Sequence, residues 1–165
     1  MHKKCDNFQI NLLVFKNSRL DMQHIAIMKK SWRLTEKILA GEKTLETRWY
    51  KNKYPPWNNI KKGDIIYFKD SGEPVTIKAE VTKFLRFDNL DNKKSNNIME
   101  KYGNLDTGNK ELSLEIKNYI NNKNYCILIF FDKVMKIKPF SIDKKGFGLM
   151  SSWICVDNVE RLKKR

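Results

Sequence analysis

The run NYCILIFFDKVMKI at residues 124–137 constrains the fold more than any other part of the sequence. Its first half is almost continuously apolar and rich in β-branched and aromatic residues, which is typical of a strand buried inside a sheet. We therefore predict a central strand at residues 124–137, which the other strands of the sheet must flank.

Five further segments have the pattern of strands. They are short apolar runs, or alternations of apolar and polar residues, bounded by turn-forming residues. Residues 65–69 and 75–87 are separated by a turn that contains SGE, so we predict that they pair antiparallel and that the second, longer strand bends. The five segments are HIAIM at 24–28, KTLETRWY at 43–50, residues 65–69, residues 75–87 and SSWICV at 151–156.

Two regions are predicted to be helical. SWRLTEKILAGEK opens with Ser31, a natural N-cap, and its apolar residues recur with the period of a helix until Gly41, a natural C-cap. The polar segment 88–124 is predicted to be mostly helical and to lie at the sheet edge. Residues 1–22 are interpreted as an N-terminal arm, and residues 23–165 as a single domain. The fold class is α+β: a small mixed β-barrel of about six strands with flanking helices.

The positive charge is unevenly distributed. The chain of 165 residues has a formal net charge of +14, and Lys and Arg outnumber acidic residues by ten to three in residues 28–62 and by nine to three in residues 133–165. In residues 88–124 the counts are six and six. Two basic blocks favour a polyanionic partner such as a nucleic acid. The alternative is a chain that uses lysine only for solubility.

Cysteine and histidine do not form a metal-binding pattern. The three cysteines, Cys5, Cys126 and Cys155, are far apart, and neither His2 nor His24 completes a ligand set, so we predict no metal and no cofactor. Unpaired cysteines in apolar runs suggest a reducing compartment, and the short N-terminal apolar run is not a signal peptide or a membrane span. We therefore expect a cytoplasmic protein that does not bind membranes; its oligomeric state is left open.

The stretch GEKTLETR at residues 41–48 concentrates charged residues in a predicted strand. Because side chains alternate between the two faces of a strand, Glu46 and Arg48 should share one face and Trp49 should lie on the other, in the core. Lys43, at the turn, can reach either face. Glu46 and Arg48 can therefore hydrogen-bond each other or a ligand between them.

GEKTLETR fits the GxKxxExR motif of ASCH domains, and the order of elements around it, with KKGD following, is also similar to that family. The resemblance covers roughly residues 24–137, and the last predicted strand would close the barrel. It implies a PUA-like β-barrel with a cleft between the barrel and the first helix. It also implies that Lys43, Glu46 and Arg48 line this cleft and that the ligand is RNA or a nucleotide.

Some small bacterial relatives in this family are amidohydrolases that release the acetyl group of N4-acetylcytidine. They use the motif lysine, a threonine three positions later and a separate glutamate. Here Lys43 matches the lysine, but Glu46 stands where the threonine would be. If the chain is an enzyme, Lys43 and Glu46 are the catalytic candidates. A ribonuclease activity is also known in the family, without a motif that maps onto this sequence.

The predicted nucleic-acid-binding residues have structural alternatives. Lys43 is either a cation for a phosphate or base carbonyl, a catalyst with a lowered pKa, or a solvated turn lysine. Glu46 can accept hydrogen bonds from a base amine, and Arg48 can bind phosphate or only orient Glu46. For base stacking we select Trp32 or Trp153, although most tryptophans are core residues. The full set is Lys30, Trp32, Lys43, Glu46, Arg48 and Trp153.

Three functions follow from these patterns. The leading hypothesis is a module that holds a base of single-stranded or modified RNA, or a nucleoside or nucleotide, in the motif cleft. The second is the amidohydrolase, and the third is a protein-interaction domain whose charge serves solubility. A Ser or Cys nucleophile is poorly supported, because neither His2 nor His24 is well placed to act as its base.

Overall fold

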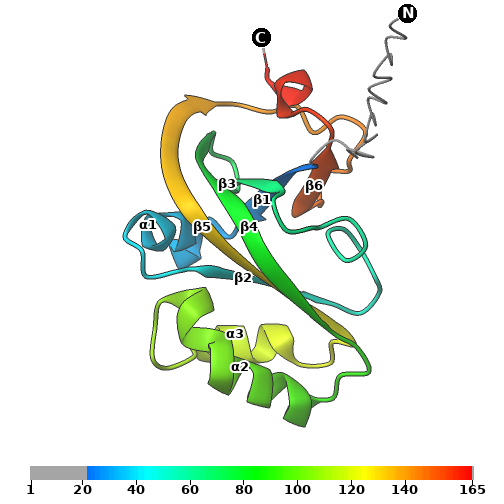
Figure 1. Ribbon diagram of the computed structural model, residues 1–165. Coiled ribbons are helices and arrows are strands. Elements are labelled where there is room, and N and C mark those ends of the chain that lie inside the picture. The colour runs from blue at the N-terminus through cyan, green and yellow to red at the C-terminus, as the bar shows by residue number, and fades with distance from the viewer. Residues whose placement is uncertain (1–21, 165) are drawn as a thin grey trace, which may run out of the picture.

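The computed structural model describes residues 22–164, which form one six-stranded sheet with the order β2-β5-β4-β3-β1-β6 (Figure 1). All neighbouring pairs are antiparallel except β1 and β3, which are parallel. The strands are β1 (Gln23–Met28), β2 (Leu45–Tyr50), β3 (Ile65–Asp70), β4 (Val75–Phe87), β5 (Tyr125–Phe140) and β6 (Trp153–Val156). The predicted arm, residues 1–22, lies outside the described residues apart from Met22.

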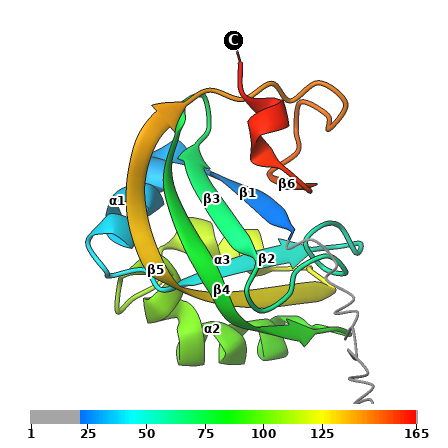
Figure 2. The same cartoon turned by 45° about the horizontal axis from the view of Figure 1, so that its top comes forward.

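The strand predictions are confirmed. β5 lies between β2 and β4, as expected for the most apolar run. β4 contains 13 residues, and its pairing with β5 shifts register at three places. Such bulges bend strands and increase their twist. The two long strands therefore curl the sheet into a half-barrel, which Figure 2 shows from above. The α+β barrel-like fold class is confirmed.

The first helix differs from its prediction. A short 3-10 helix, Lys30–Trp32, is followed by Arg33 with φ 53°, and only then by α1 (Leu34–Leu39). Ser31 is therefore inside the 3-10 turn and does not cap the helix. The predicted end is close to correct: Ala40 is the C-cap, and Gly41 follows with φ 75°, a left-handed conformation that glycine adopts without strain.

The segment 88–124 contains α2 (Asn92–Thr107) and α3 (Leu114–Ile120). Asp91 caps α2 by accepting a hydrogen bond from the Lys94 amide, and Ser113 caps α3 in the same way. Figure 1 shows both helices beneath β2 and β5. A buried cluster joins them to the sheet, and it includes Leu45, Trp49, Ile98, Met99, Ile120 and Leu128. Trp49 is thus a core residue, as predicted.

The two edges of the sheet are β2 and β6. β6 pairs antiparallel with β1, and the strands described do not pair across the gap between β6 and β2. The half-barrel is therefore completed at this seam by side chains rather than by backbone hydrogen bonds. No helix within residues 22–164 has the length and apolar character needed to cross a membrane.

Candidate functional site

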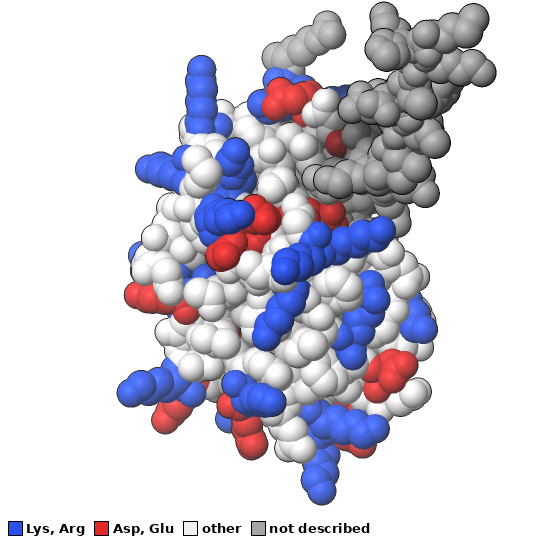
Figure 3. Space-filling view, viewed as in Figure 1, with Lys and Arg blue, Asp and Glu red and all other residues white. Residues whose placement is uncertain are grey.

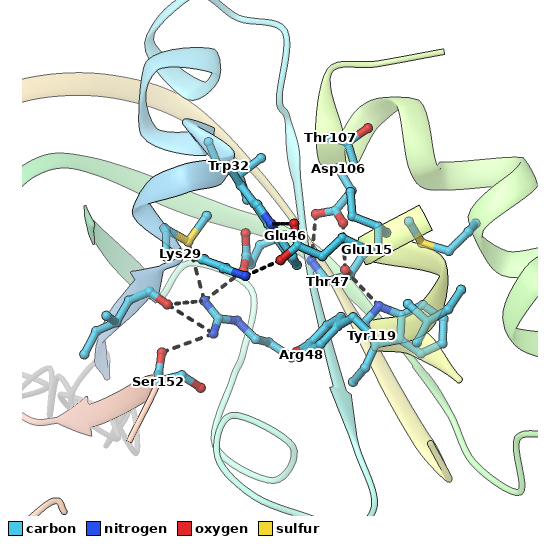
Figure 4. A pocket seen from close by; sticks show the side chains of 17 residues that line it. Lys29, Trp32, Glu46, Thr47, Arg48, Asp106, Thr107, Glu115, Tyr119 and Ser152 are labelled. Atoms are coloured by element: carbon cyan, nitrogen blue, oxygen red, sulfur yellow. Dashed lines mark hydrogen bonds and ion pairs between the residues drawn. The ribbon is translucent and has the colours of Figure 1, made fainter. Parts of the chain in front are cut away.

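The motif strand β2 borders a cavity of about 350 Å³, shown in Figure 4. Glu46 and Arg48 both line it and contact each other at 2.8 Å, as expected for side chains on one face of the strand. Leu45 and Trp49 belong to the buried cluster with α2 and α3, although Trp49 also borders the cavity. The cavity lies between β2, the end of β1, the 3-10 turn and the two helices α2 and α3. Its other lining residues include Met28, Lys29, Trp32, Thr47, Asp106, Glu115, Ile116, Tyr119 and Ser152.

Lys43 is completely buried, with 0% of its surface exposed, so the alternative of a solvated lysine at a turn is wrong. Its Nζ donates to the carbonyl oxygens of Leu45 and Asp106 at 2.6 and 2.7 Å, and to Asp106 Oδ1 at 2.5 Å. An ammonium group has three donors, and these contacts use all of them. Lys43 therefore has no hydrogen left for a phosphate or a base.

The pKa of Lys43 is raised, not lowered. Burial acts to lower this pKa, but the carboxylates of Asp106 and Glu46 outweigh burial. The direction of this shift does not support the interpretation of Lys43 as a catalyst with a lowered pKa. Lys43 instead acts as a fixed positive charge that ties the start of β2 to the end of α2.

Asp106 was not among the predicted site residues. It lies near the end of α2, and its Oδ2 accepts a 2.7 Å hydrogen bond from the Thr47 hydroxyl, while Oδ1 accepts from the Thr47 amide at 3.1 Å. Burial raises the pKa of Asp106, although Lys43 and Thr47 act in the opposite direction. Trp49 Nε1 also donates to the Thr47 hydroxyl oxygen at 3.0 Å. The helical segment thus contributes directly to the site.

Glu46 lies between the two basic residues of the motif. Its Oε1 is 2.8 Å from Arg48 Nη2, and its Oε2 is 2.9 Å from Lys43 Nζ. The three hydrogens of Lys43 are already directed at other oxygens, so Glu46 Oε2 forms no hydrogen bond with residues 22–164 besides this ion pair. Arg48 Nε also has no hydrogen-bond partner among these residues. The site therefore contains one buried donor without a partner in the described protein, Arg48 Nε, and one buried acceptor, Glu46 Oε2, whose contact is the ion pair with Lys43.

Arg48 spans the open seam of the sheet. Its guanidinium donates to the carbonyl oxygen of Ser152 at 3.2 Å and to that of Ile27 at 3.4 Å, and it lies 5.1 Å from the ring centre of Trp153. Burial acts to lower the pKa of Arg48, but Glu46 outweighs it and the pKa is raised. Arg48 can therefore orient Glu46 and still border the cavity.

The mouth of the cavity carries exposed polar contacts. Glu115 of α3 pairs with Lys29 and accepts a 2.8 Å hydrogen bond from Trp32 Nε1. The Trp32 ring meets Tyr119 edge-on, with 5.8 Å between ring centres. In Figure 4, the Glu115 side chain reaches from α3 to meet Lys29 and Trp32, which come from the opposite side of the cavity. These residues connect the 3-10 turn to α3.

The predicted binding residues separate into four places. Trp32, Glu46 and Arg48 line the cavity, and Lys43 is buried behind it. Trp153 lies behind Arg48 and is nearly buried. Lys30 is exposed and pairs with Glu73, so it is its neighbour Lys29 that reaches the cavity.

His24 lies in a buried cluster of polar contacts that its position in the sequence did not indicate. Its Nε2 is 3.0 Å from Asp64 Oδ2, and its Nδ1 accepts from Trp153 Nε1 at 3.1 Å and lies 3.2 Å from Cys155 Sγ. Burial raises the pKa of the Cys155 thiol to about 12, which opposes a thiolate nucleophile. His24 is thus a structural residue that supports Trp153. No cluster of His, Cys, Asp and Glu in the described part of the chain has the arrangement of a metal site.

No protein-family model and no curated protein matches this chain. Solved structures do match. The crystal structure of ASCH from Zymomonas mobilis has 15% sequence identity and a TM-score of 0.58, with 81% of this chain and 87% of that chain covered. A tyrosine-to-phenylalanine variant of that protein has the same identity and a TM-score of 0.60, with coverages of 86% and 99%. The chain therefore has the ASCH fold, which confirms the resemblance seen in the sequence.

Proposed function

We propose that this ASCH-fold chain binds a nucleobase in the cavity lined by Glu46 and Arg48, either from single-stranded or modified RNA or from a free nucleotide. The observation that carries the proposal is a buried donor without a partner in the described protein, Arg48 Nε, beside a buried acceptor, Glu46 Oε2, whose one close contact is the ion pair with Lys43; both residues line one cavity. A buried polar atom without a partner costs about 1–3 kcal/mol. A ligand that accepts from Arg48 Nε recovers this cost, and it can donate a further hydrogen bond to Glu46 Oε2.

The Watson–Crick edge of a base has the matching chemistry. Adenine and cytosine each carry an exocyclic amine, which donates, beside a ring nitrogen, which accepts. The amine can donate to Glu46 Oε2, and the ring nitrogen can accept from Arg48 Nε. An unstacked base of single-stranded RNA exposes this edge, whereas a paired base does not.

The size and lining of the cavity also suit a base. Its volume of about 350 Å³ is near the lower end of the usual range for small-molecule sites, about 300–1,000 Å³. Trp32 and Tyr119 offer aromatic surface, and Met28 and Ile116 offer apolar surface. Such surroundings favour a flat, mostly apolar ring with a few polar atoms.

The charges around the cavity favour a base inside it and phosphates outside it. Glu46, Asp106 and Glu115 place three carboxylates around the cavity, which disfavours a phosphate inside it. The exterior is basic, and Figure 3 shows Lys and Arg side chains spread over the face that β4 and β5 cross. The arrangement supports a base inside the cavity and phosphates outside it, where their binding should weaken with salt.

The Arg48 Nε–H group gives a direct test. In the free protein this donor has no partner among the described residues. Titration with cytidine or adenosine monophosphate should shift its ¹H and ¹⁵N resonances as the hydrogen bond forms, with saturation. The exposed side chain of Arg33, which pairs with Glu36, should not move. A cavity ligand that leaves the Arg48 signal unchanged contradicts the proposed contact.

Hydrolysis of an acylated base is a second candidate, because one observation favours it. The Thr47 hydroxyl donates to Asp106 Oδ2 at 2.7 Å, with Lys43 on the other oxygen of that carboxylate. This places a nucleophile beside a base even though Glu46 occupies the position of the threonine in relatives. Here Thr47 and Asp106 replace the predicted pair Lys43 and Glu46 as the reacting groups.

For this candidate, incubation with N4-acetylcytidine should release cytidine and acetate, measured by chromatography. Thr47→Val should abolish the release while leaving the circular dichroism spectrum and cytidine binding intact. If wild-type protein at high concentration releases no cytidine, or if Thr47→Val retains the activity, this mechanism is excluded.

A further inference from the structure

A second hollow lies on the other side of Arg48 and Trp153. We call it the aromatic groove; it has a volume of about 1050 Å³, and Tyr50, Tyr54, Phe147 and Trp153 line it together with the rest of the loop at residues 146–152. Its walls expose apolar surface: Tyr54 is 56% exposed and Phe147 is 37% exposed. In so polar a chain, a contiguous apolar surface indicates a binding site.

The aromatic groove is adjacent to the cavity lined by Glu46 and Arg48, which we call the base cavity. Ser152 lines both, and its carbonyl oxygen accepts the hydrogen bond from Arg48. The wall between the two hollows is the Arg48 guanidinium against the Trp153 ring, with 5.1 Å between them. The two hollows therefore lie on either side of Ser152, close enough for neighbouring parts of one ligand.

The groove combines aromatic rings with positive charge. Tyr50 and Tyr54 meet edge-on at 6.0 Å, and the Tyr50 hydroxyl is fixed by a 2.9 Å hydrogen bond to the Pro55 carbonyl oxygen. Unlike the base cavity, the groove has no Asp or Glu among its described lining residues. Basic residues occur in the two segments that form its sides.

Lysines flank both sides of the groove in sequence. On one side, Lys53 lies between Tyr50 and Tyr54 in the chain, with its Nζ 5.3 Å from the ring centre of Tyr125. On the other side, Lys144 Nζ donates to the carbonyl oxygens of Leu149 and Ser151 at 2.7 and 2.8 Å. Lys144 thus fixes the loop that carries Phe147. Aromatic stacking surfaces beside cations are the features that bind single-stranded nucleic acids.

We infer that the ligand is a single strand of at least two nucleotides, with one base in the cavity and the neighbouring base stacked in the aromatic groove. This inference rests on the proposed function, since it places the second base relative to the first. It distinguishes an oligonucleotide-binding protein from one that binds free nucleosides. The phosphate that joins the two nucleotides would pass outside Ser152, near the basic side chains.

The test compares three ligands by fluorescence anisotropy or calorimetry: a nucleoside monophosphate, a dinucleotide, and a dinucleotide whose second sugar lacks a base. Stacking of the second base should make the intact dinucleotide bind about tenfold tighter than the abasic one. The abasic ligand controls for the added phosphate charge. RNA and DNA forms of the dinucleotide show which sugar the site accepts.

Tyr54→Ala and Phe147→Ala should each remove most of this gain and leave the affinity for the monophosphate unchanged. Met135→Ala, an exposed apolar residue on β5 that lines neither hollow, is the matched control. Equal affinity for the intact and abasic dinucleotides, or a gain that survives both groove substitutions, overturns the inference.

The outcome also separates the two proposals. If the base cavity is the wrong site, substitution of Glu46 will not affect any ligand, although the groove variants can still weaken dinucleotide binding. If only the groove is wrong, the monophosphate will bind in a manner that depends on Glu46, and the second base will add nothing.

Discussion

Replacement of Lys43 by Met is expected to lower the free energy of unfolding by about 3–5 kcal/mol, the usual cost of removing one partner of a buried ion pair. Met keeps the length of the side chain but removes its charge and its three hydrogen bonds. Asp106 is then left buried opposite an apolar group, and Glu46 keeps only Arg48 as its cationic partner. Urea denaturation followed by tryptophan fluorescence gives the change in unfolding free energy.

Two variants make this result specific. Lys133→Met removes an exposed lysine that pairs with Glu80, and it should change stability little. The double variant Lys43→Met with Asp106→Asn should recover part of the loss, because the uncompensated carboxylate is gone. A Lys43→Met protein as stable as Lys133→Met would show that the buried network does not hold β2 to α2.

Replacement of Arg48 by Met should cost about 3 kcal/mol, the lower end of the range for breaking a buried ion pair. The cost is lower than at Lys43, since Glu46 retains Lys43 as a partner. Arg48 also joins β2 to the carbonyl oxygens of Ile27 and Ser152 across the seam between the sheet edges. Its loss should therefore loosen that seam as well as destabilise the whole fold.

Hydrogen exchange separates these two effects. In Arg48→Met, the amides of β6 should exchange through local opening, at a rate higher than global unfolding alone would give. The amides in the centre of β5 should exchange at the rate set by the free energy of global unfolding. Arg33→Met, which removes an exposed arginine, serves as the control. Uniform exchange throughout the sheet would contradict the role of Arg48 as a bridge across the seam.

Local patterns in the sequence predicted the sheet and one wall of the site. The apolar run at residues 124–137 gave the central strand, and the alternation in GEKTLETR placed Glu46 and Arg48 on one face. Both predictions depend only on the period of a strand. The likeness of the fold to ASCH structures agrees with the motif that suggested it.

The parts that could not be predicted depend on contacts distant in sequence. Asp106 lies in a polar helical segment with balanced charge, and no local pattern marks it as the partner of Lys43 and Thr47. Lys43 can be fully buried because Asp106 pairs with its charge. When that partner is not known, a lysine beside a turn is equally compatible with an exposed side chain. The 3-10 turn at Lys30–Trp32 was not predicted either, and in it Lys30 pairs with Glu73 while Lys29 lines the cavity.

The central claim is that a base binds against Glu46, and equilibrium titration of Glu46→Gln with adenosine or cytidine monophosphate tests it most directly. Gln keeps the shape of the side chain but replaces an oxygen that accepts from the base amine with a weaker, uncharged group. Glu36→Gln, an exposed glutamate on α1, is the matched control. The account predicts an affinity loss of about tenfold or more in Glu46→Gln and none in Glu36→Gln, with both proteins folded. Equal affinity in the two variants would contradict it.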